Sequence, residues 1–255
     1  MSGAEPAVYR PDLSLRGKLR RRIVRLQHRR PALSAPGGPW VTFSFDDAPR
    51  SAFSEGLPIL EAHGVRATLF ACGGLVGATT VLGPMMGADE LRAAHARGHE
   101  VAGHTFSHRD LGQATVAQTE AELDADLGAF RELGLPPPAT FAYPYGDVCA
   151  AAKAVCGARF ALSRALHPGR VTKGSDLAQA PATSTDGPGG EAAAMTALRE
   201  TAARGGWLIL FGHRVDRSGG EFATDPDALS RLAAAAIQLG LEPVTAAAGV
   251  RRLGA

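Results

Sequence analysis

The 255-residue sequence has few cysteines, few aromatic residues and no long hydrophobic run. Its three cysteines are too sparse for a disulfide framework, so we expect free buried thiols in a reducing compartment. The longest compact apolar run covers only residues 207–211, whereas a membrane span needs about 18 residues. Residues 1–11 lack the apolar segment of a signal peptide. We therefore expect a cytoplasmic protein.

The overall composition is that of a folded globular protein. Apolar residues make up 45% of the chain and charged residues 20%, which excludes wholesale disorder. The length suits one large core, and a barrel of about 250 residues would use all of it. The 31 glycines and 17 prolines predict many loops.

The net charge of +2 hides an asymmetry along the chain. Residues 1–30 carry nine Lys or Arg and two acids, a net charge of +7. Residues 31–255 carry 18 bases and 23 acids, a net charge of −5. The basic pI therefore comes from an N-terminal arm and not from a nucleic-acid-binding body, and we predict no nucleic-acid partner.

The arm has the pattern of a basic amphipathic helix. Leu15, Leu19, Ile23 and Leu26 recur at helical spacing, and arginines occupy the other faces. One interpretation is contact of residues 13–30 with an anionic membrane, at its inner face. The alternative is a helix that packs its leucines on the body and leaves its arginines in solvent. The Pro- and Gly-rich residues 31–39 then predict a linker, so that 1–39 form an arm and 40–255 a catalytic domain.

Short apolar runs alternate with helical patterns from residue 40 onward. This alternation predicts an α/β fold with a mostly parallel sheet, either open or closed into a barrel. Residues 165–190 are rich in Gly and Pro and receive no assignment. The predicted strands are 41–45, 67–71, 99–103, 140–143, 160–163, 207–211 and 242–245, and the predicted helices are 52–63, 88–97, 115–133, 148–156, 191–204 and 227–239.

Two polar motifs follow predicted strands, where α/β folds place their active sites. Asp46 and Asp47 are adjacent carboxylates, and their repulsion is offset if a cation binds or if the two groups act differently. A simple Asp-Pro-type turn is the alternative. His104 and His108 lie four residues apart, so a helical turn would place both on one face, as in zinc hydrolases. An ordinary pair of surface histidines is equally compatible with this spacing.

Two further features complete the pattern. His213 ends the apolar run 207–211, and its ordinary pKa suits proton transfer near neutrality, although a lone histidine there can also be structural. Residues 141–146 run from a strand into a constrained turn around Pro144 that can present a backbone N–H to an oxyanion.

The combination resembles the polysaccharide deacetylases of the NodB-homology type, carbohydrate esterase family 4. That family has an Asp-Asp motif, a His-x-x-x-His motif, an aromatic-Pro-Tyr-Gly turn and a Leu-x-x-His strand end. These look like Asp46-Asp47, His104 with His108, residues 143–146, and Leu210 with His213. The resemblance covers roughly residues 40–246. It implies a distorted (β/α) barrel with about seven strands.

The resemblance also implies a role for each matching residue. Asp46 matches the catalytic base, and His213 matches the general acid. Tyr145 matches the residue whose backbone N–H helps to hold the oxyanion. The metal triad is Asp47, His104 and His108. The implied cofactor is a divalent metal, usually Zn²⁺, with Co²⁺ or Mn²⁺ as alternatives.

Two positions depart from the family pattern. Many members have Gly where this chain has Ala48, which suggests a different turn. Many members also have Arg at the position of Ala142, paired with the base. Arg50, Arg109 and Arg214 lie near the motifs and are candidates to replace that Arg.

The family's acid that tunes the catalytic His has no clear match, and Asp176 is the one candidate. Of the other histidines, we expect His63, His95 and His167 at the surface, and His99 in a structural role.

We therefore predict a metal-dependent N-deacetylase acting on N-acetylhexosamine units of a bacterial exopolysaccharide or its lipid-linked precursor. Such a hydrolase releases acetate. Two alternatives stay open. One is a deacylase or amidase of the same fold that acts on a lipid-linked sugar or a small amide. The other is a glycan-binding relative without turnover.

Overall fold

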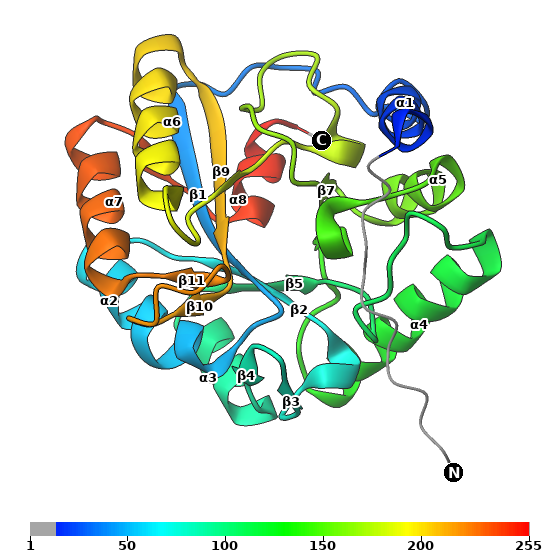
Figure 1. The fold of residues 1–255 in the computed structure, drawn as a ribbon, viewed down its shortest axis with the longest axis horizontal. Coiled ribbons are helices and arrows are strands. Elements are labelled where there is room, and N and C mark those ends of the chain that lie inside the picture. Colours follow the sequence, from blue (N-terminus) through cyan, green and yellow to red (C-terminus); the bar gives the residue numbers. More distant parts are fainter. Residues whose placement is uncertain (1–13, 255) are drawn as a thin grey trace.

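The computed structural model describes residues 14–254. Figure 1 shows a central sheet with most helices arranged around its outside. The α-helices are α1 Leu15–Val24, α2 Leu57–Ala62, α3 Ala88–Ala96, α4 Val116–Glu132, α5 Ala150–Arg159, α6 Gly190–Arg204, α7 Pro226–Gln238 and α8 Ala246–Arg252. The strands are β1 Pro39–Asp46, β2 Thr68–Ala71, β3 Thr79–Thr80, β4 Gly83–Pro84, β5 Glu100–Gly103, β6 Thr140–Ala142, β7 Leu162–Arg164, β8 Thr183–Ser184, β9 Gly206–Gly212, β10 Arg214–Val215, β11 Ala223–Thr224 and β12 Glu242–Pro243.

The main sheet follows the order β7-β6-β5-β2-β1-β9-β8, and β12 pairs with β1. Every pairing in this sheet is parallel. A parallel bridge between Arg164 and Ala180, just before β8, links the two ends of the path. The α/β class and the distorted (β/α) barrel of about seven strands are thus confirmed. All carboxyl ends of the strands meet at one edge, which is where such folds hold their sites.

Side chains alternate between two cores along the central strands. Phe43 and Leu208 face the helices outside the sheet. Trp207 and Ile209 face the inside, against the C-terminal helix α8. Because both faces are covered, β9 is buried over its whole length and its sequence is a continuous apolar run.

Every predicted strand and helix is present, with shifts near the ends, but the structure also contains elements that were not predicted, among them the short strands β3, β4, β10 and β11. Residues 165–190, which received no assignment, contain β8 and a 3₁₀ turn at Leu177–Gln179. Helix α8 was not predicted. The predicted helix 52–63 begins as a π-helix at Ala52–Gly56 before it continues as α2. No helix among the described residues is long and apolar enough to cross a membrane.

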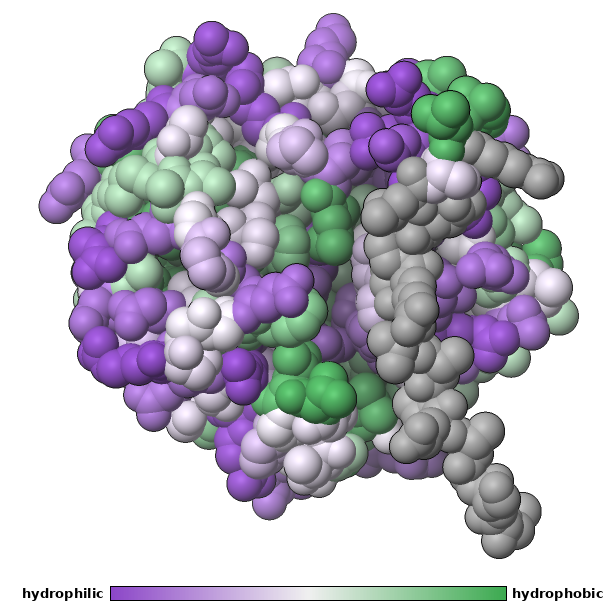
Figure 2. All heavy atoms as spheres, in the orientation of Figure 1, coloured by the Kyte–Doolittle hydropathy of each residue, from purple (hydrophilic) through white to green (hydrophobic). Residues whose placement is uncertain are grey.

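Helix α1 packs on the body, but the face that it turns toward the body is not its leucine stripe. Val24 is buried, and Lys153 donates to its carbonyl at 2.9 Å. The stripe of Leu15, Leu19 and Ile23 faces solvent, with Leu15 86% exposed. Figure 2 shows hydrophobic surface over α1 beside strongly hydrophilic surface. The alternative in which these leucines pack on the body is therefore wrong.

The predicted linker also contacts the body. Ala32 is buried, and its N–H donates to the carbonyl of Ser175 at 2.8 Å. The Arg30 guanidinium donates to the carbonyls of Gly157 and Phe160 at 3.1 and 2.6 Å. The arm is thus held in place on both sides of Pro31.

Candidate active site

The six predicted site residues line one cavity at the carboxyl edge of the sheet. The cavity has a volume of about 250 Å³. Its lining consists of Asp46, Asp47, His104, His108, Tyr145 and His213 together with Leu75, Thr80, Val81, Leu82, Leu166 and Phe222. The six residues come from the ends of β1, β5, β6 and β9, so the sheet brings together motifs that lie up to 167 positions apart in the sequence. Figure 2 shows hydrophobic surface over the β3–β4 hairpin, which supplies Thr80 to the cavity wall.

Asp46 is the last residue of β1, and it is buried beside a cation that the sequence analysis missed. The guanidinium Nη2 of Arg164 donates to Asp46 Oδ1 at 2.5 Å. Burial alone raises the pKa of Asp46, but the charges of Arg164 and of nearby histidines outweigh burial, and its pKa is lowered. The Asp46 carboxylate is thereby held in its ionised form.

Arg164 is fully buried and is fixed by more than its ion pair. Its guanidinium carbon lies 5.0 Å from the ring centres of both Phe70 and Phe211. In the β6–β7 register, Arg164 is the Cα partner of Ala142. The arginine that the family pattern places at Ala142 is thus present one strand away. The proposed replacements Arg50, Arg109 and Arg214 were wrong.

Asp47 and Ala48 form a strained turn after β1. Their φ angles are +63° and +51°, a left-handed conformation that side chains rarely adopt. The turn rotates Asp47 away from the sheet, and its Oδ1 is buried without a hydrogen-bond partner among the described residues. Burial raises the pKa of Asp47. Because Ala48 adopts a conformation that suits glycine, the substitution at this position keeps the turn.

His104 and His108 converge on the Asp47 carboxylate. The Nε2 atom of His104 lies 3.5 Å from Asp47 Oδ1, and the Nε2 atom of His108 lies 3.2 Å from it. The predicted helical turn is wrong, because Thr105 and His108 have positive φ angles and the segment is an irregular loop. The left-handed backbone at Thr105 and His108, and not a helical turn, directs both imidazole rings toward Asp47.

The three residues fit a divalent cation. Their ligand atoms all lie within 4.8 Å of one another. The Nδ1–H of His104 donates to the carbonyl of Ala142 at 2.7 Å, which leaves the Nε2 lone pair for a ligand. Burial lowers the pKa of both His104 and His108 to about 4, so both imidazoles are neutral, as metal binding requires. The unpartnered Asp47 oxygen supplies the anionic donor.

The loop that carries His104 is supported from α4 by Asp126. Its Oδ1 accepts from the N–H of Gly73 at 2.8 Å. Burial raises the pKa of Asp126 to about 7, while hydrogen bonds from the backbone of Gly73 and His104 oppose that rise. Asp126 thus ties the loop after β2 to the loop after β5.

Tyr145 lies beside His108 at the mouth of the cavity. Their ring centres are 4.5 Å apart, and the tyrosine is about two fifths exposed. Tyr145 and Gly146 both have positive φ angles, at +58° and +65°. The constrained turn that the sequence predicted is thus present.

His213 follows β9 and is held by Asp186, which the sequence analysis also missed. His213 Nδ1 lies 2.7 Å from Asp186 Oδ2, and the Thr224 hydroxyl donates to the other oxygen at 2.6 Å. Burial lowers the pKa of His213, but the Asp186 carboxylate outweighs burial and the pKa is raised. Asp176, the predicted acid, instead pairs with Lys153 at 2.6 Å, so that prediction was wrong.

The structure also tests the expectations for four other histidines. His95 is exposed, as predicted, whereas His63 is half-buried with its Nε2 3.0 Å from the Ser230 hydroxyl. His99 is buried between Glu61 and the N–H of Ala67 and is structural, as predicted. His167 is not a simple surface group, because its Nδ1 is buried without a hydrogen-bond partner among residues 14–254.

Comparisons with known proteins agree with this geometry. Residues 34–158 match the family model described as polysaccharide deacetylase. A chitooligosaccharide deacetylase of Sinorhizobium fredii is 40% identical over 91 residues, which are 35% of this chain and 39% of that protein. The chain thus spans about two fifths of the length of this curated relative.

Two solved structures show the same fold. A family 4 carbohydrate esterase from Streptomyces lividans, in complex with acetate, has a TM-score of 0.56 at 22% identity and covers 81% of this chain and 92% of its own. A family 4 acetyl xylan esterase from Clostridium thermocellum, in complex with a cobalt ion, has a TM-score of 0.54 at 18% identity. That likeness covers 81% of this chain and 87% of the esterase.

Proposed function

We propose, on the premise that this chain belongs to the polysaccharide deacetylase family, that it is a metal-dependent N-deacetylase. Its substrate in this proposal is an N-acetylhexosamine unit of a bacterial exopolysaccharide or of its lipid-linked precursor. One observation carries the proposal. A single cavity holds an ionised carboxylate backed by Arg164, a protonatable imidazole backed by Asp186, and the Asp47, His104 and His108 donor set.

Asp47, His104 and His108 would hold the divalent cation, and zinc suits two imidazoles and one carboxylate. Bound there, the cation supplies Lewis-acid chemistry, which polarises an amide carbonyl and makes a water molecule more acidic. Cobalt and manganese accept the same donors. The cobalt ion in the Clostridium thermocellum esterase supports a divalent cation in this fold.

Asp46 would act as the base. A carboxylate kept ionised by Arg164 can accept a proton from the attacking water at neutral pH. The two rings hold the Arg164 guanidinium, and its hydrogen bond holds the Asp46 carboxylate, so little reorganisation is needed when the proton arrives. The water oxygen then bonds to the acyl carbon.

His213 would act as the acid. The C–N bond breaks with its electron pair on nitrogen, and an amine leaves readily only when that nitrogen receives a proton. The raised pKa of His213 keeps the imidazolium available for this transfer. The products are acetate and a free amino sugar, and the backbone at Tyr145 is the proposed partner of the developing oxyanion.

The membrane is the proposed location of this reaction. Helix α1 exposes Leu15, Leu19 and Ile23, and Leu26 is exposed just after it. The same segment carries basic residues, which suits contact with an anionic lipid surface. We place this contact at the inner face, where a lipid-linked precursor would be available.

Acetate release from an N-acetylglucosamine pentamer tests the function. The protein is stripped of metal with a chelator and reloaded with Zn²⁺, Co²⁺ or Mn²⁺, beside the Asp46→Asn and His104→Ala variants. We expect metal-restored acetate release that each substitution lowers at least about 10²-fold. A thermal shift on metal addition gives a readout independent of turnover.

Two outcomes contradict the proposal. Metal binding without acetate release from the pentamer would favour the deacylase or glycan-binding alternatives. Absence of metal binding in the parent protein would overturn the assignment of Asp47, His104 and His108.

A further inference from the structure

A groove runs from the mouth of the active site toward the N-terminal arm. Its first cavity, of about 320 Å³, shares Tyr145 and Leu166 with the active-site cavity. Its second cavity, of about 400 Å³, shares Arg25, His167 and Gln179 with the first. The active-site cavity and these two cavities are thus neighbours in a row, joined by shared lining residues. We call the two cavities together the arm groove.

The lining of the arm groove is rich in arginine. Arg21 and Arg25 come from α1, Arg29 from the segment after it, and Arg170 from the loop after β7. Because α1 lies outside residues 34–158, which match the family model, this chain builds one wall of the groove from a segment that the model does not include.

The acids on the groove are already neutralised. Asp147 pairs with Arg20 at 2.9 Å, and Asp176 pairs with Lys153 at 2.6 Å. Neither cation lines the groove. Within the described residues, Arg25, Arg29 and Arg170 form no ion pair, although the Arg29 guanidinium donates to the carbonyl of Gly174 at 2.9 Å. Because the two acids of the groove pair with Arg20 and Lys153, the groove carries net positive charge.

Two buried polar atoms on the groove also lack partners. Arg170 Nε and His167 Nδ1 form no hydrogen bond among residues 14–254. An unmade hydrogen bond at a buried group is unfavourable, so a hydrogen-bond acceptor placed beside Arg170 would be stabilising. The pKa of His167 is lowered to about 4 by burial and then by the charge of Arg25, as expected where the potential is positive.

The stem of Arg170 is fixed by close contact with β9. A Cβ atom at Gly206 would come within 2.9 Å of Arg170 Cδ, and Gly206 has a φ of +103°. Only glycine meets both conditions at low cost. The stem of Arg170 thus packs against the start of β9.

We propose that the arm groove is a subsite for a phosphate or diphosphate group carried by the glycan substrate. Guanidinium groups match phosphate oxygens in a two-point geometry, and several unpaired arginines suit a group with two or more negative charges better than a single carboxylate. An N-acetylhexosamine in the active site would then extend past Tyr145 and Leu166 toward Arg25 and Arg170. The inference deepens the proposed function and depends on it for the sugar end of the ligand.

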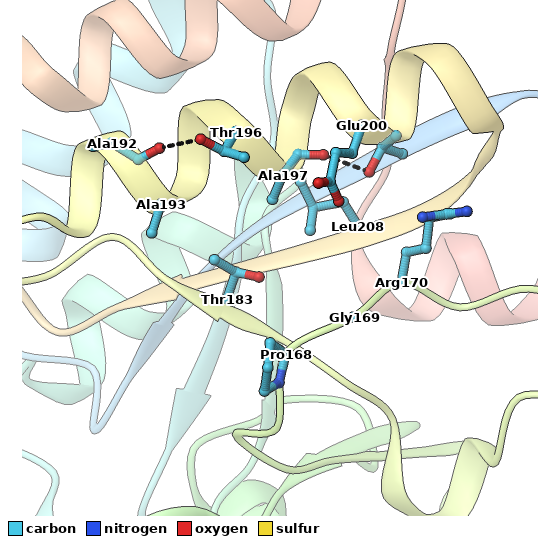
Figure 3. A pocket seen from close by; sticks show the side chains of 11 residues that line it. Pro168, Gly169, Arg170, Thr183, Ala192, Ala193, Thr196, Ala197, Glu200 and Leu208 are labelled. Atoms are coloured by element: carbon cyan, nitrogen blue, oxygen red, sulfur yellow. Dashed lines mark hydrogen bonds between the residues drawn. The ribbon is translucent and has the colours of Figure 1, made fainter.

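A neighbouring hollow supports no similar argument. Figure 3 shows it on the other side of residues 168–170, between that loop and α6. Its lining includes small side chains such as Ala192 and Ala193, the acid Glu200, and Arg170, which thus borders both this hollow and the arm groove. None of the six site residues lines it.

Steady-state kinetics on three matched substrates tests the proposal. These are an uncharged N-acetylglucosamine oligosaccharide, the same sugar with a reducing-end methyl diphosphate, and the same sugar with a short polyprenyl diphosphate. We expect kcat/KM about tenfold higher for both diphosphates, mainly through KM. A gain confined to the polyprenyl form would instead assign the preference to the lipid and overturn the phosphate subsite.

The variants are Arg25→Ala and Arg170→Ala, with Arg22→Ala as the matched control. Arg22 is an exposed arginine of α1 that lines neither cavity. The two groove variants should lose the diphosphate preference and keep their kcat on the uncharged sugar. If all three substitutions change the diphosphate preference equally, the groove arginines act only as general surface charge, and the proposal is overturned.

Binding of inorganic pyrophosphate, followed by calorimetry, separates this inference from the proposed function. Binding that weakens about tenfold in Arg25→Ala and Arg170→Ala, but not in Arg22→Ala, supports the subsite even if no acetate is released. Loss of acetate release together with intact pyrophosphate binding would contradict the proposed function alone. Absence of pyrophosphate binding in the parent protein contradicts the subsite.

Discussion

Ala142 and Arg164 are partners across neighbouring strands, and this explains how the site keeps a cation beside Asp46. With the arginine on β7 instead of β6, the guanidinium reaches Asp46 from a different direction, but the carboxylate still has a positive charge beside it. The cost of burying Arg164 is offset by its ion pair and by the rings of Phe70 and Phe211.

Arg164→Ala should lower kcat for acetate release by about 10²-fold with little change in KM, because Asp46, the proposed base, loses its orientation. Removing one partner of a buried pair should also cost about 3–5 kcal/mol of stability. The double variant Arg164→Ala/Ala142→Arg should regain at least about tenfold in kcat, since the guanidinium returns from the adjacent strand. Arg50→Ala, an exposed arginine paired with Glu90, is the control.

The measurement is kcat per folded protein, with folding followed by circular dichroism. If folded Arg164→Ala retains wild-type kcat, Arg164 has a purely structural role and does not position Asp46.

Asp186 sets the protonation of His213, so its removal should appear in the pH profile. General-acid catalysis needs the imidazolium, and kcat therefore falls as pH rises through the pKa of His213. Asp186 raises that pKa, which keeps the acid protonated to higher pH. In Asp186→Asn the alkaline fall in kcat should begin at lower pH.

Asp176→Asn is the control for this profile, because Asp176 pairs with Lys153 and not with His213. Its alkaline limb should match that of the wild type. If the alkaline fall in kcat is identical in Asp186→Asn and the wild type, His213 is not the group whose titration causes it.

At the scale of elements, the sequence predicted the strands and helices that frame the site. Apolar runs and helical periodicity are local signals, and they located β1, β9, α4 and α7 to within a few residues. Helix α8 was missed because its short Ala-rich run lacks a clear apolar stripe. Short β8 was missed because two residues show no alternation.

Arg164 and Asp186 were missed because sequence patterns report only local structure. Arg164 directly follows the predicted strand 160–163, the same strand-end signal that marked Asp46, but only the β6–β7 register shows that it replaces an arginine at Ala142. Asp186 follows β8 within the unassigned region 165–190, so its place at the sheet edge could not be predicted. Pairing across strands depends on the whole chain, and no local pattern encodes it.

Loop conformation limited the prediction of the histidine motif. A spacing of four residues suggested a helical turn. In the structure, positive φ angles at Thr105 and His108 instead direct the His104 and His108 rings toward Asp47. Such conformations cost about 1–3 kcal/mol each and persist only where the surrounding structure enforces them. The support from Asp126 on α4 to Gly73 and His104 is of that kind.

At the scale of the whole molecule, the arm groove joins the active site to a helix that exposes its apolar stripe. Arg21 of α1 and Arg25 just after it border the cavity that opens beside Tyr145, whereas Leu19 and Ile23 border a separate cavity with Cys149 and Ala150. A lipid-linked substrate could place its sugar in the active site, its diphosphate on the arginines and its lipid in the bilayer beside α1. The structure also shows why deleting the whole arm is a poor test, since Arg20, Val24 and Arg30 contact the body.

Point substitutions on the exposed stripe give the sharper test of membrane contact. The double variant Leu19→Ser/Leu26→Ser should weaken binding to phosphatidylglycerol vesicles about tenfold or more, because each leucine loses about 1.5–3 kcal/mol of burial. Vesicle co-sedimentation measures this, with phosphatidylcholine vesicles as the uncharged reference. Leu239→Ser, at an exposed leucine at the end of α7, is the control and should bind as the wild type does.

Activity on a soluble oligosaccharide should stay unchanged in all variants, because none of these leucines lines the active-site cavity. Equal vesicle binding by the stripe variant and the control would exclude α1 as the membrane contact and leave the arm groove as a subsite for soluble phosphorylated glycans.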